Sequence, residues 1–244
     1  MNLNKLILTK NDCYKAGEKI NVKGIMVHST GANNPYLKRY LPDDGKIGKN
    51  QYGNHWNTAR PGGRKVCVHA FIGKLADGTV ASYQTLPWNH RGWHAGGSAN
   101  NTHIGFEICE DGLSDREYFN AVYREAVELS AYLCKEYGLN ENNIICHCEG
   151  YKKGIASNHG DVMHWFTKHG KSMETFRADV KNILSGTADP QKVPELTTVN
   201  DIVWELAHRG IITDKALWLK KLETDTNSYW LTRKTVKYLR EKGV

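Results

Sequence analysis

The chain of 244 residues is 40% hydrophobic and 24% charged, a composition typical of a globular protein. This composition excludes a collagen-like or low-complexity chain, and because no run of 18 apolar residues occurs, we expect no membrane insertion. The 33 basic and 26 acidic residues give a net charge of +7, which favours an anionic partner such as nucleic acid, a membrane surface or an acidic wall polymer.

The N-terminal residues and the cysteines indicate where the protein is made and in which redox state its thiols are. Met1 to Leu8 is too short and too mixed in polarity for the apolar region of a signal peptide, so we expect synthesis in a cytoplasm. The six cysteines form no C-x-x-C pair, and we interpret them mostly as reduced core residues.

Short apolar runs predict strands in the first part of the chain, at 23–29, 66–72, 79–84 and 104–109. Asp77 and Gly78 lie between the second and third runs, which is typical of a β-hairpin. Residues 32–65 are rich in Asn, Gly, Pro, Lys and Tyr and predict a long loop with one helical turn at most. Loops of this length are usually functional or mobile.

The clearest helix is predicted over 116–137, because its apolar residues recur at steps of 3 and 4: Phe119, Val122, Ala126, Leu129 and Leu133. Ser114 or Asp115 can cap its start, and Gly138 can end it. A short strand at 144–146 and an amphipathic helix within 166–184 follow. The sequence therefore predicts an α/β fold, with a mixed central sheet flanked by helices.

A separate C-terminal part is predicted from a change of composition. Residues 186–196 contain Pro190 and Pro194 and no apolar periodicity, which indicates a linker. Helix-like patterns follow at 197–210, 217–222 and 230–239. We therefore expect a main domain over 1–185 and a small helical domain over 197–244.

Histidines at strand ends are the residues most informative about chemistry. His28 and His147 each follow an apolar run, and Asp161 lies close after His147 in the sequence. Two imidazoles and a carboxylate would leave an open position for water, as catalytic zinc requires. Since a lone histidine after a strand is more often a surface or capping residue, spacing alone does not establish this site.

Other residues remain open as ligands at this stage. His164 is the main rival to Asp161 as the third ligand. Cys146 and Cys148 flank His147, but neighbours of a strand residue point to the opposite face, which disfavours them. Glu107 lies in an apolar strand, where an unpaired carboxylate is costly, so it should be paired, bound to a metal or facing a cleft.

Four motifs in order resemble one enzyme family: Val27-His28-Ser29-Thr30, Trp93-His94-Ala95-Gly96, Ile104-Gly105-Phe106-Glu107-Ile108 and His147-x-Glu149. This set is similar to the zinc-dependent N-acetylmuramoyl-L-alanine amidases of the type 2 amidase and peptidoglycan-recognition superfamily, over about residues 20–185. The segment 154–166 resembles a subgroup found in phage endolysins and autolysins of Gram-positive hosts.

The resemblance implies a set of roles for individual residues. His28, His147 and Asp161 would be the zinc ligands, and Glu107 would transfer the proton during amide hydrolysis. His159 occupies the place of a family lysine and would be the catalytic group that stabilises the oxyanion, although this departure leaves that role open. Val68 occupies the place of a tyrosine found in many relatives, so the role of that tyrosine is absent or taken over by Glu107. His94, Trp93 and Trp56 are candidates for binding the substrate, although the two tryptophans could equally be core residues.

The C-terminal residues resemble a small helical module of clostridial-type lysins, through the segments 214–219 and 227–231. This resemblance implies a cell-wall-binding domain and an enzyme that acts on the wall after release, with peptidoglycan and anionic wall polymers as partners. The positive charge is spread along the chain, so we expect no nucleic-acid partner. Self-association through this domain stays open, because so small a core is marginal on its own. The alternative functions are a non-catalytic peptidoglycan-binding protein of the same fold and a nucleic-acid-binding protein, the latter suggested only by charge.

Overall fold

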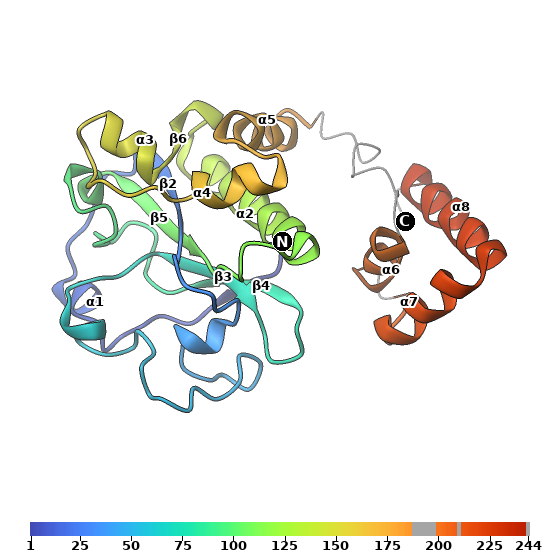
Figure 1. Ribbon diagram of the computed structural model, residues 1–244. Coiled ribbons are helices and arrows are strands. Elements are labelled where there is room, and N and C mark those ends of the chain that lie inside the picture. The colour runs from blue at the N-terminus through green and yellow to red at the C-terminus, as the bar shows by residue number, and fades with distance from the viewer. Residues whose placement is uncertain (187–198, 209–210, 243–244) are drawn as a thin grey trace. The chain divides into compact units, whose positions relative to one another are not determined.

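A six-stranded sheet forms the centre of the first of two units into which the chain divides, Met1–Leu184 and Ser185–Val244 (Figure 1). The structure is a computed structural model that describes residues 1–186, 199–208 and 211–242. Across the sheet the order is β1-β4-β3-β5-β2-β6, and every neighbouring pair is parallel except β3 and β4. The strands are β1 (Leu3–Lys5), β2 (Gly24–Ser29), β3 (Ala70–Lys74), β4 (Val80–Gln84), β5 (His103–Ile108) and β6 (Ile144–Cys146).

This sheet confirms the mixed α/β fold and the hairpin that were predicted from the sequence. The strand predicted at 66–72 starts later than expected, as β3. Cys67 exchanges backbone hydrogen bonds with Trp93, at N–O distances of 3.2 and 3.0 Å, so the chain joins the sheet only at Ala70. The short elements β1 and α1 (Asp12–Ala16) were not predicted from the sequence, because so few residues show no periodicity.

One face of the sheet is covered by α2 (Arg116–Tyr137) and α5 (Met173–Leu184), which pack on one another. Helix α2 has the predicted bounds: the Asp115 side chain accepts hydrogen bonds from the N–H groups of Glu117 and Tyr118, and Gly138 ends the helix at φ 62°. Buried side chains of the two layers form one core, among them Ile25, Val27, Ile104 and Phe106 from the sheet and Phe119, Val122 and Ala126 from α2.

The opposite face of the sheet is covered by the long loop at 32–65, which contains the 3-10 turns η1 (Leu37–Arg39) and η2 (Pro61–Gly63). Leu37, Leu41 and Ile47 of this loop are fully buried and pack with Phe71 and Tyr83 of the sheet. Because side chains alternate along a strand, His28 in β2 lies on this loop-covered face, whereas its neighbour Val27 faces the helices.

Three further short segments lie around the end of β6. They are α3 (His147–Lys152), α4 (Met163–Phe166) and η5 (Thr167–His169). Two other 3-10 turns, η3 (Ser98–Asn101) and η4 (Glu141–Asn143), come directly before β5 and β6. His147 therefore begins a helix, and the predicted strand ends at Cys146.

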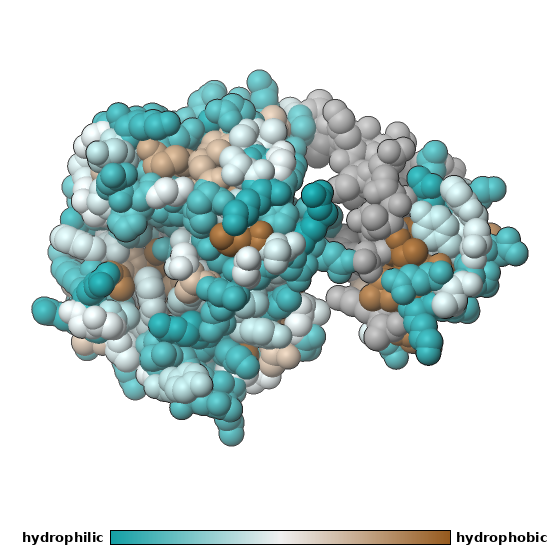
Figure 2. All heavy atoms as spheres, in the orientation of Figure 1, coloured by the Kyte–Doolittle hydropathy of each residue, from teal (hydrophilic) through white to brown (hydrophobic). Residues whose placement is uncertain are grey.

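The second unit contains α6 (Val199–His208), α7 (Lys215–Thr224) and α8 (Thr226–Lys242), close to the three predicted helical segments. Its core is small, with these buried apolar residues: Ile202, Val203, Leu206, Ile212, Leu222 and Val236. From residue 187 on, the predicted linker at 186–196 lies outside the described residues. Among the described helices none is long and apolar enough to cross a membrane, and the face drawn in Figure 2 is mostly hydrophilic with small apolar patches.

Candidate active site

A cleft of about 1080 Å³ opens on the loop-covered face of the sheet. Strands β2 and β5, the start of α3 and the turn before α4 contribute polar side chains to it. The eight residues proposed from the sequence as ligands, catalytic groups or substrate contacts all line it: His28, Trp56, Trp93, His94, Glu107, His147, His159 and Asp161. The fold therefore brings together residues that are up to 133 positions apart.

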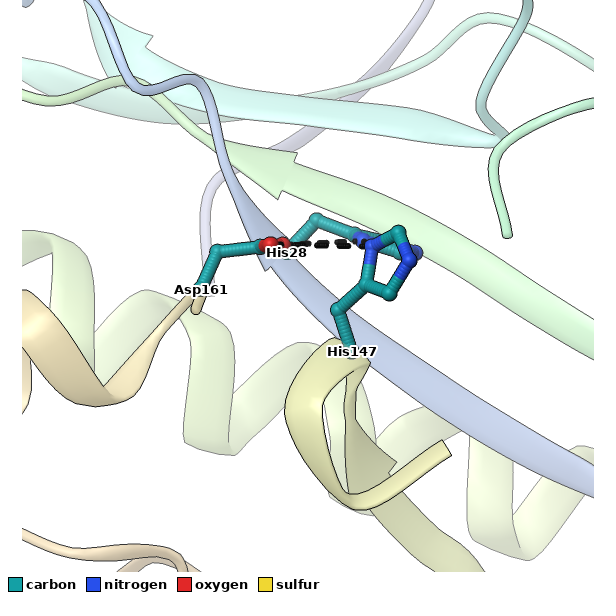
Figure 3. A group of neighbouring side chains, drawn as sticks. All are labelled: His28, His147 and Asp161. Carbon is teal, nitrogen blue, oxygen red and sulfur yellow. Dashed lines mark hydrogen bonds and ion pairs between the residues drawn. The ribbon is translucent and has the colours of Figure 1, made fainter. Parts of the chain in front are cut away.

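The side chains of His28, His147 and Asp161, which all line the cleft, point toward one another (Figure 3). The Nδ1 atoms of His28 and His147 lie 3.1 Å apart, and Oδ2 of Asp161 lies 3.1 Å from Nδ1 of His28. Oδ1 of Asp161 is 3.6 Å from Nδ1 of His147. One ligand atom from each residue can be chosen so that all three lie within 4.8 Å of one another, which is the geometry of a candidate metal centre.

Electrostatics favours a neutral His28 imidazole beside an ionised Asp161 carboxylate. Burial lowers the pKa of His28, although Asp161 opposes this shift. Burial raises the pKa of Asp161, but hydrogen bonds from His147 and His28 outweigh it and hold this pKa well below its ordinary range. Neutral imidazole and carboxylate are the protonation states in which these groups bind metals.

Glu107 lies beside His28, its partner in the register of β2 and β5. Its Oε2 atom is buried and has no hydrogen-bond partner among the described residues. Burial raises the pKa of Glu107 well above its ordinary value, and the charges of Asp161 and Glu110 add to this shift. A buried carboxyl group that lines a cleft without a hydrogen-bond partner is a candidate for general acid–base catalysis.

His159 is exposed at the rim of the cleft, and its ring centroid lies 4.7 Å from that of His147. Trp93 also lies at the rim, with Arg91 and Lys65 at 4.6 and 5.4 Å from its ring centroid. Trp56 is half-buried, and its ring packs edge-on against Phe71 at a centroid distance of 5.0 Å. Trp56 therefore combines a core contact with a position in the cleft lining.

His164 lines the same cleft, but each rival ligand is engaged with another partner. Nε2 of His164 forms an ion pair with Oε1 of Glu110 at 2.9 Å. The Sγ atoms of Cys146 and Cys148 face each other at 3.2 Å. The strand argument against Cys148 was wrong in its premise, because His147 begins a helix; neither cysteine belongs to the metal group found among the described residues.

Several lining residues were not identified from the sequence, among them Arg39, Arg64 and Ser157. Arg39 and Arg64 come from the long loop and add positive charge to the cleft. Ser157 lies next to His147, with Oγ 3.2 Å from Nε2 of that ring. Only the segment 154–166, quoted for its resemblance, could have pointed to Ser157, since serine alone carries no such signal.

His69, which was assigned no chemical role, is a buried structural residue. Its Nε2 lies 2.8 Å from the carbonyl of His90, and its Nδ1 accepts the N–H of Gly105 at 3.0 Å. Both nitrogens are thus used by the neutral ring.

This buried ring gives an expected pH dependence. Burial lowers the pKa of His69 from 6.5 to about 4. The unfolded chain therefore binds the proton first, so the contribution of His69 is complete above about pH 6.5 and is lost as the pH falls toward 4. The loss should be about 3 kcal/mol. The free energy of unfolding, measured by urea denaturation at pH values between 4 and 7, should depend less on pH for His69→Asn than for the wild type. An equal pH dependence in the two proteins would contradict this assignment.

The chain belongs to the N-acetylmuramoyl-L-alanine amidase family, whose model matches residues 18–168. Two curated relatives carry related names. The lytic amidase of Streptococcus pneumoniae phage HB-3 is 28% identical over 178 residues, 69% of this chain and 50% of that protein. N-acetylmuramoyl-L-alanine amidase XlyA of Bacillus subtilis (strain 168) is 40% identical over 68 residues, 27% of this chain and 22% of that protein. The chain thus matches half or less of the length of these relatives.

A solved structure shares the fold. The Staphylococcus aureus hydrolase AmiA, determined in complex with its ligand, aligns with a TM-score of 0.56 at 16% identity, covering 77% of this chain and 84% of that one. The predicted amidase fold, a mixed central sheet flanked by helices, is confirmed by this likeness, and the family predicted from the motifs is confirmed by the match over residues 18–168.

Proposed function

We propose that this protein is a zinc-dependent endolysin that hydrolyses the amide bond between N-acetylmuramic acid and L-alanine and so lyses Gram-positive cell walls. The observation that carries the proposal is the convergence of His28, His147 and Asp161 beside the unpaired carboxyl of Glu107, in the cleft of an amidase-family chain. Each of these groups has a part in metal-assisted amide hydrolysis.

The three converging residues fit zinc by their chemistry. Two imidazole nitrogens and a carboxylate oxygen are a donor set that zinc accepts, and three protein ligands leave a position open. Two Nδ1 atoms that face each other at 3.1 Å, beside an ionised carboxylate, also favour a cation between them. Zinc bound there would supply Lewis acidity toward the scissile carbonyl and the attacking water.

The chain's own residues then supply proton transfer and orientation. The Glu107 carboxylate takes the proton of the attacking water and later delivers it to the amine nitrogen of the leaving L-alanine. An N–H of His159, in the place of the family lysine, donates to the developing oxyanion, a contribution typically worth about 10²–10³ in rate. His94, Trp93 and Trp56 line the cleft where the sugar and the first stem residue would bind.

The second unit is proposed as a wall-binding domain that acts with the amidase after release from the cytoplasm. Trp230, Leu231 and Tyr238 of α8 are each at least half exposed, with Arg233 5.2 Å from the Trp230 ring centroid. Exposed aromatic and basic side chains of this kind suit an anionic wall polymer.

The experiment that tests this proposal joins metal analysis with mass spectrometry of digested peptidoglycan. We expect one zinc per chain and new products that carry a free L-alanine amine and an intact lactyl group. Binding to walls without any new amine would instead favour the non-catalytic binding protein, and cleavage at another bond would reject the proposed specificity.

Truncation after Ser185 tests whether catalysis belongs to the first unit and wall binding to the second. Residues 1–185 should stay folded and hydrolyse a small soluble muropeptide at the wild-type rate, because every proposed catalytic residue lies in this unit. Lysis of intact walls should fall, since tethering raises the effective substrate concentration without new contacts in the cleft. Full lysis by 1–185 would reject the wall-binding role, and unfolding of 1–185 would reject two independent domains.

A further inference from the structure

The outer nitrogen of His28 lies at the start of a hydrogen-bonded relay. Its Nε2 lies 2.9 Å from Nδ1 of His94, and Nε2 of His94 lies 3.2 Å from the carbonyl oxygen of His103. A carbonyl can only accept, so Nε2 of His94 carries the proton, and Nδ1 of the neutral ring must accept from His28. A bound cation would displace the proton that Nδ1 of His28 donates to Asp161, and His28 would then be protonated at Nε2 with its Nδ1 lone pair on the metal.

A second relay starts at His147. Its Nε2 lies 3.2 Å from Oγ of Ser157, and this hydroxyl donates to the carbonyl of Ala95 at 3.3 Å. Because the single hydroxyl proton is used on Ala95, Oγ accepts from Nε2–H of His147. A bound cation would likewise displace the proton that Nδ1 of His147 shares with Asp161, so that His147 would also bind the metal through Nδ1.

Both relays end on or pass through one segment, Trp93-His94-Ala95-Gly96. A buried amide fixes this segment, since Oδ1 of Asn100 accepts the N–H groups of His94 and Ala95 at 2.9 and 2.8 Å. Two glycines make room for it. A Cβ on Gly105 would lie 2.4 Å from Nδ1 of His94, and one on Gly96 would lie 2.5 Å from Oγ of Ser157.

We propose that His94 and Ser157 are positioning residues that hold His28 and His147 in the tautomer that binds a metal through Nδ1, so that the Trp93–Gly96 segment orients both imidazoles of the candidate metal centre. This inference rests on the proposed zinc site and assigns to His94 a role other than direct contact with the substrate. Partners of this kind orient metal-bound imidazoles and raise their basicity.

The first test reads the tautomers directly in the full-length wild-type protein loaded with zinc. Long-range ¹H–¹⁵N correlation spectra of histidine-labelled protein should show His28 and His147 protonated at Nε2 and bound to the metal through Nδ1. Coordination of either ring through Nε2 would overturn the proposal. This measurement requires no variant and therefore cannot fail through misfolding.

The second test measures zinc affinity by competition with a chromophoric chelator. His94→Phe and Ser157→Ala should each weaken zinc binding by about 10–100-fold. His94→Asn places an oxygen acceptor near the position of Nδ1 and should recover much of this loss. His90→Phe is the matched control, because its imidazole is buried in the same unit but takes no part in either relay.

The outcomes separate the two proposals. If the wild type holds no zinc, the proposed function fails. If the wild type holds zinc and His94→Phe and Ser157→Ala bind it as tightly as His90→Phe, only the positioning role is overturned. With Co²⁺ in place of zinc, a shift of the visible absorption spectrum in His94→Phe but not in His90→Phe would support an altered ligand field.

Discussion

Replacing Asp161 with alanine is expected to abolish both zinc retention and wall lysis. The variant would keep only two protein ligands, too few for a catalytic zinc site. It would also leave the Nδ1 atoms of His28 and His147 facing each other at 3.1 Å without the neighbouring carboxylate. His28→Ala and His147→Ala should have the same effect. Metal content after gel filtration and the clearing of a suspension of purified walls measure the two losses.

The matched control is Asp12→Ala, which removes an aspartate that pairs with Arg60 at the surface, 3.1 Å away. Exposed pairs of this kind contribute about 0–1 kcal/mol, so this variant should keep its zinc and its activity. Stoichiometric zinc and full activity in Asp161→Ala would move the third ligand to His164 or a cysteine.

The sequence predicted best those elements that are long and locally patterned. Helix α2 has the predicted bounds because its apolar periodicity, its Asp115 cap and its Gly138 stop all act within a few residues of the chain. The bounds of β3 and the existence of β1 could not be obtained this way. They depend on backbone pairing with Trp93 and with β4, residues far away in the sequence.

In the candidate site, too, the sequence predicted the local motifs but not the contacts between residues that are far apart in the chain. The motifs pointed to His28, Glu107 and Asp161, but no spacing could show that His28 and Glu107 are register partners on adjacent strands. The relays through His94 and Ser157 were also beyond the sequence. They join residues 66 and 10 positions apart through side-chain geometry, which no local pattern in the sequence encodes.

Glu107→Gln should keep its fold and its zinc but lose turnover by at least about 10²-fold, the lower end for general acid–base catalysis. The glutamine has nearly the same shape as the carboxyl group and cannot take a proton from water, so only proton transfer is removed. The side chain suits this test because its Oε2 is buried in the cleft without a hydrogen-bond partner among the described residues, so no internal bond is lost.

Turnover on a soluble muropeptide and zinc content should be measured together for Glu107→Gln and for Glu110→Gln. Glu110 is also buried and lies three residues further along, but it pairs with His164 and accepts the N–H of Gly31. We expect Glu110→Gln to retain most of its turnover, because its carboxylate is already engaged. A near-normal rate in Glu107→Gln with zinc bound would show that another group transfers the proton, and His159 at the rim of the cleft would then be the next residue to replace.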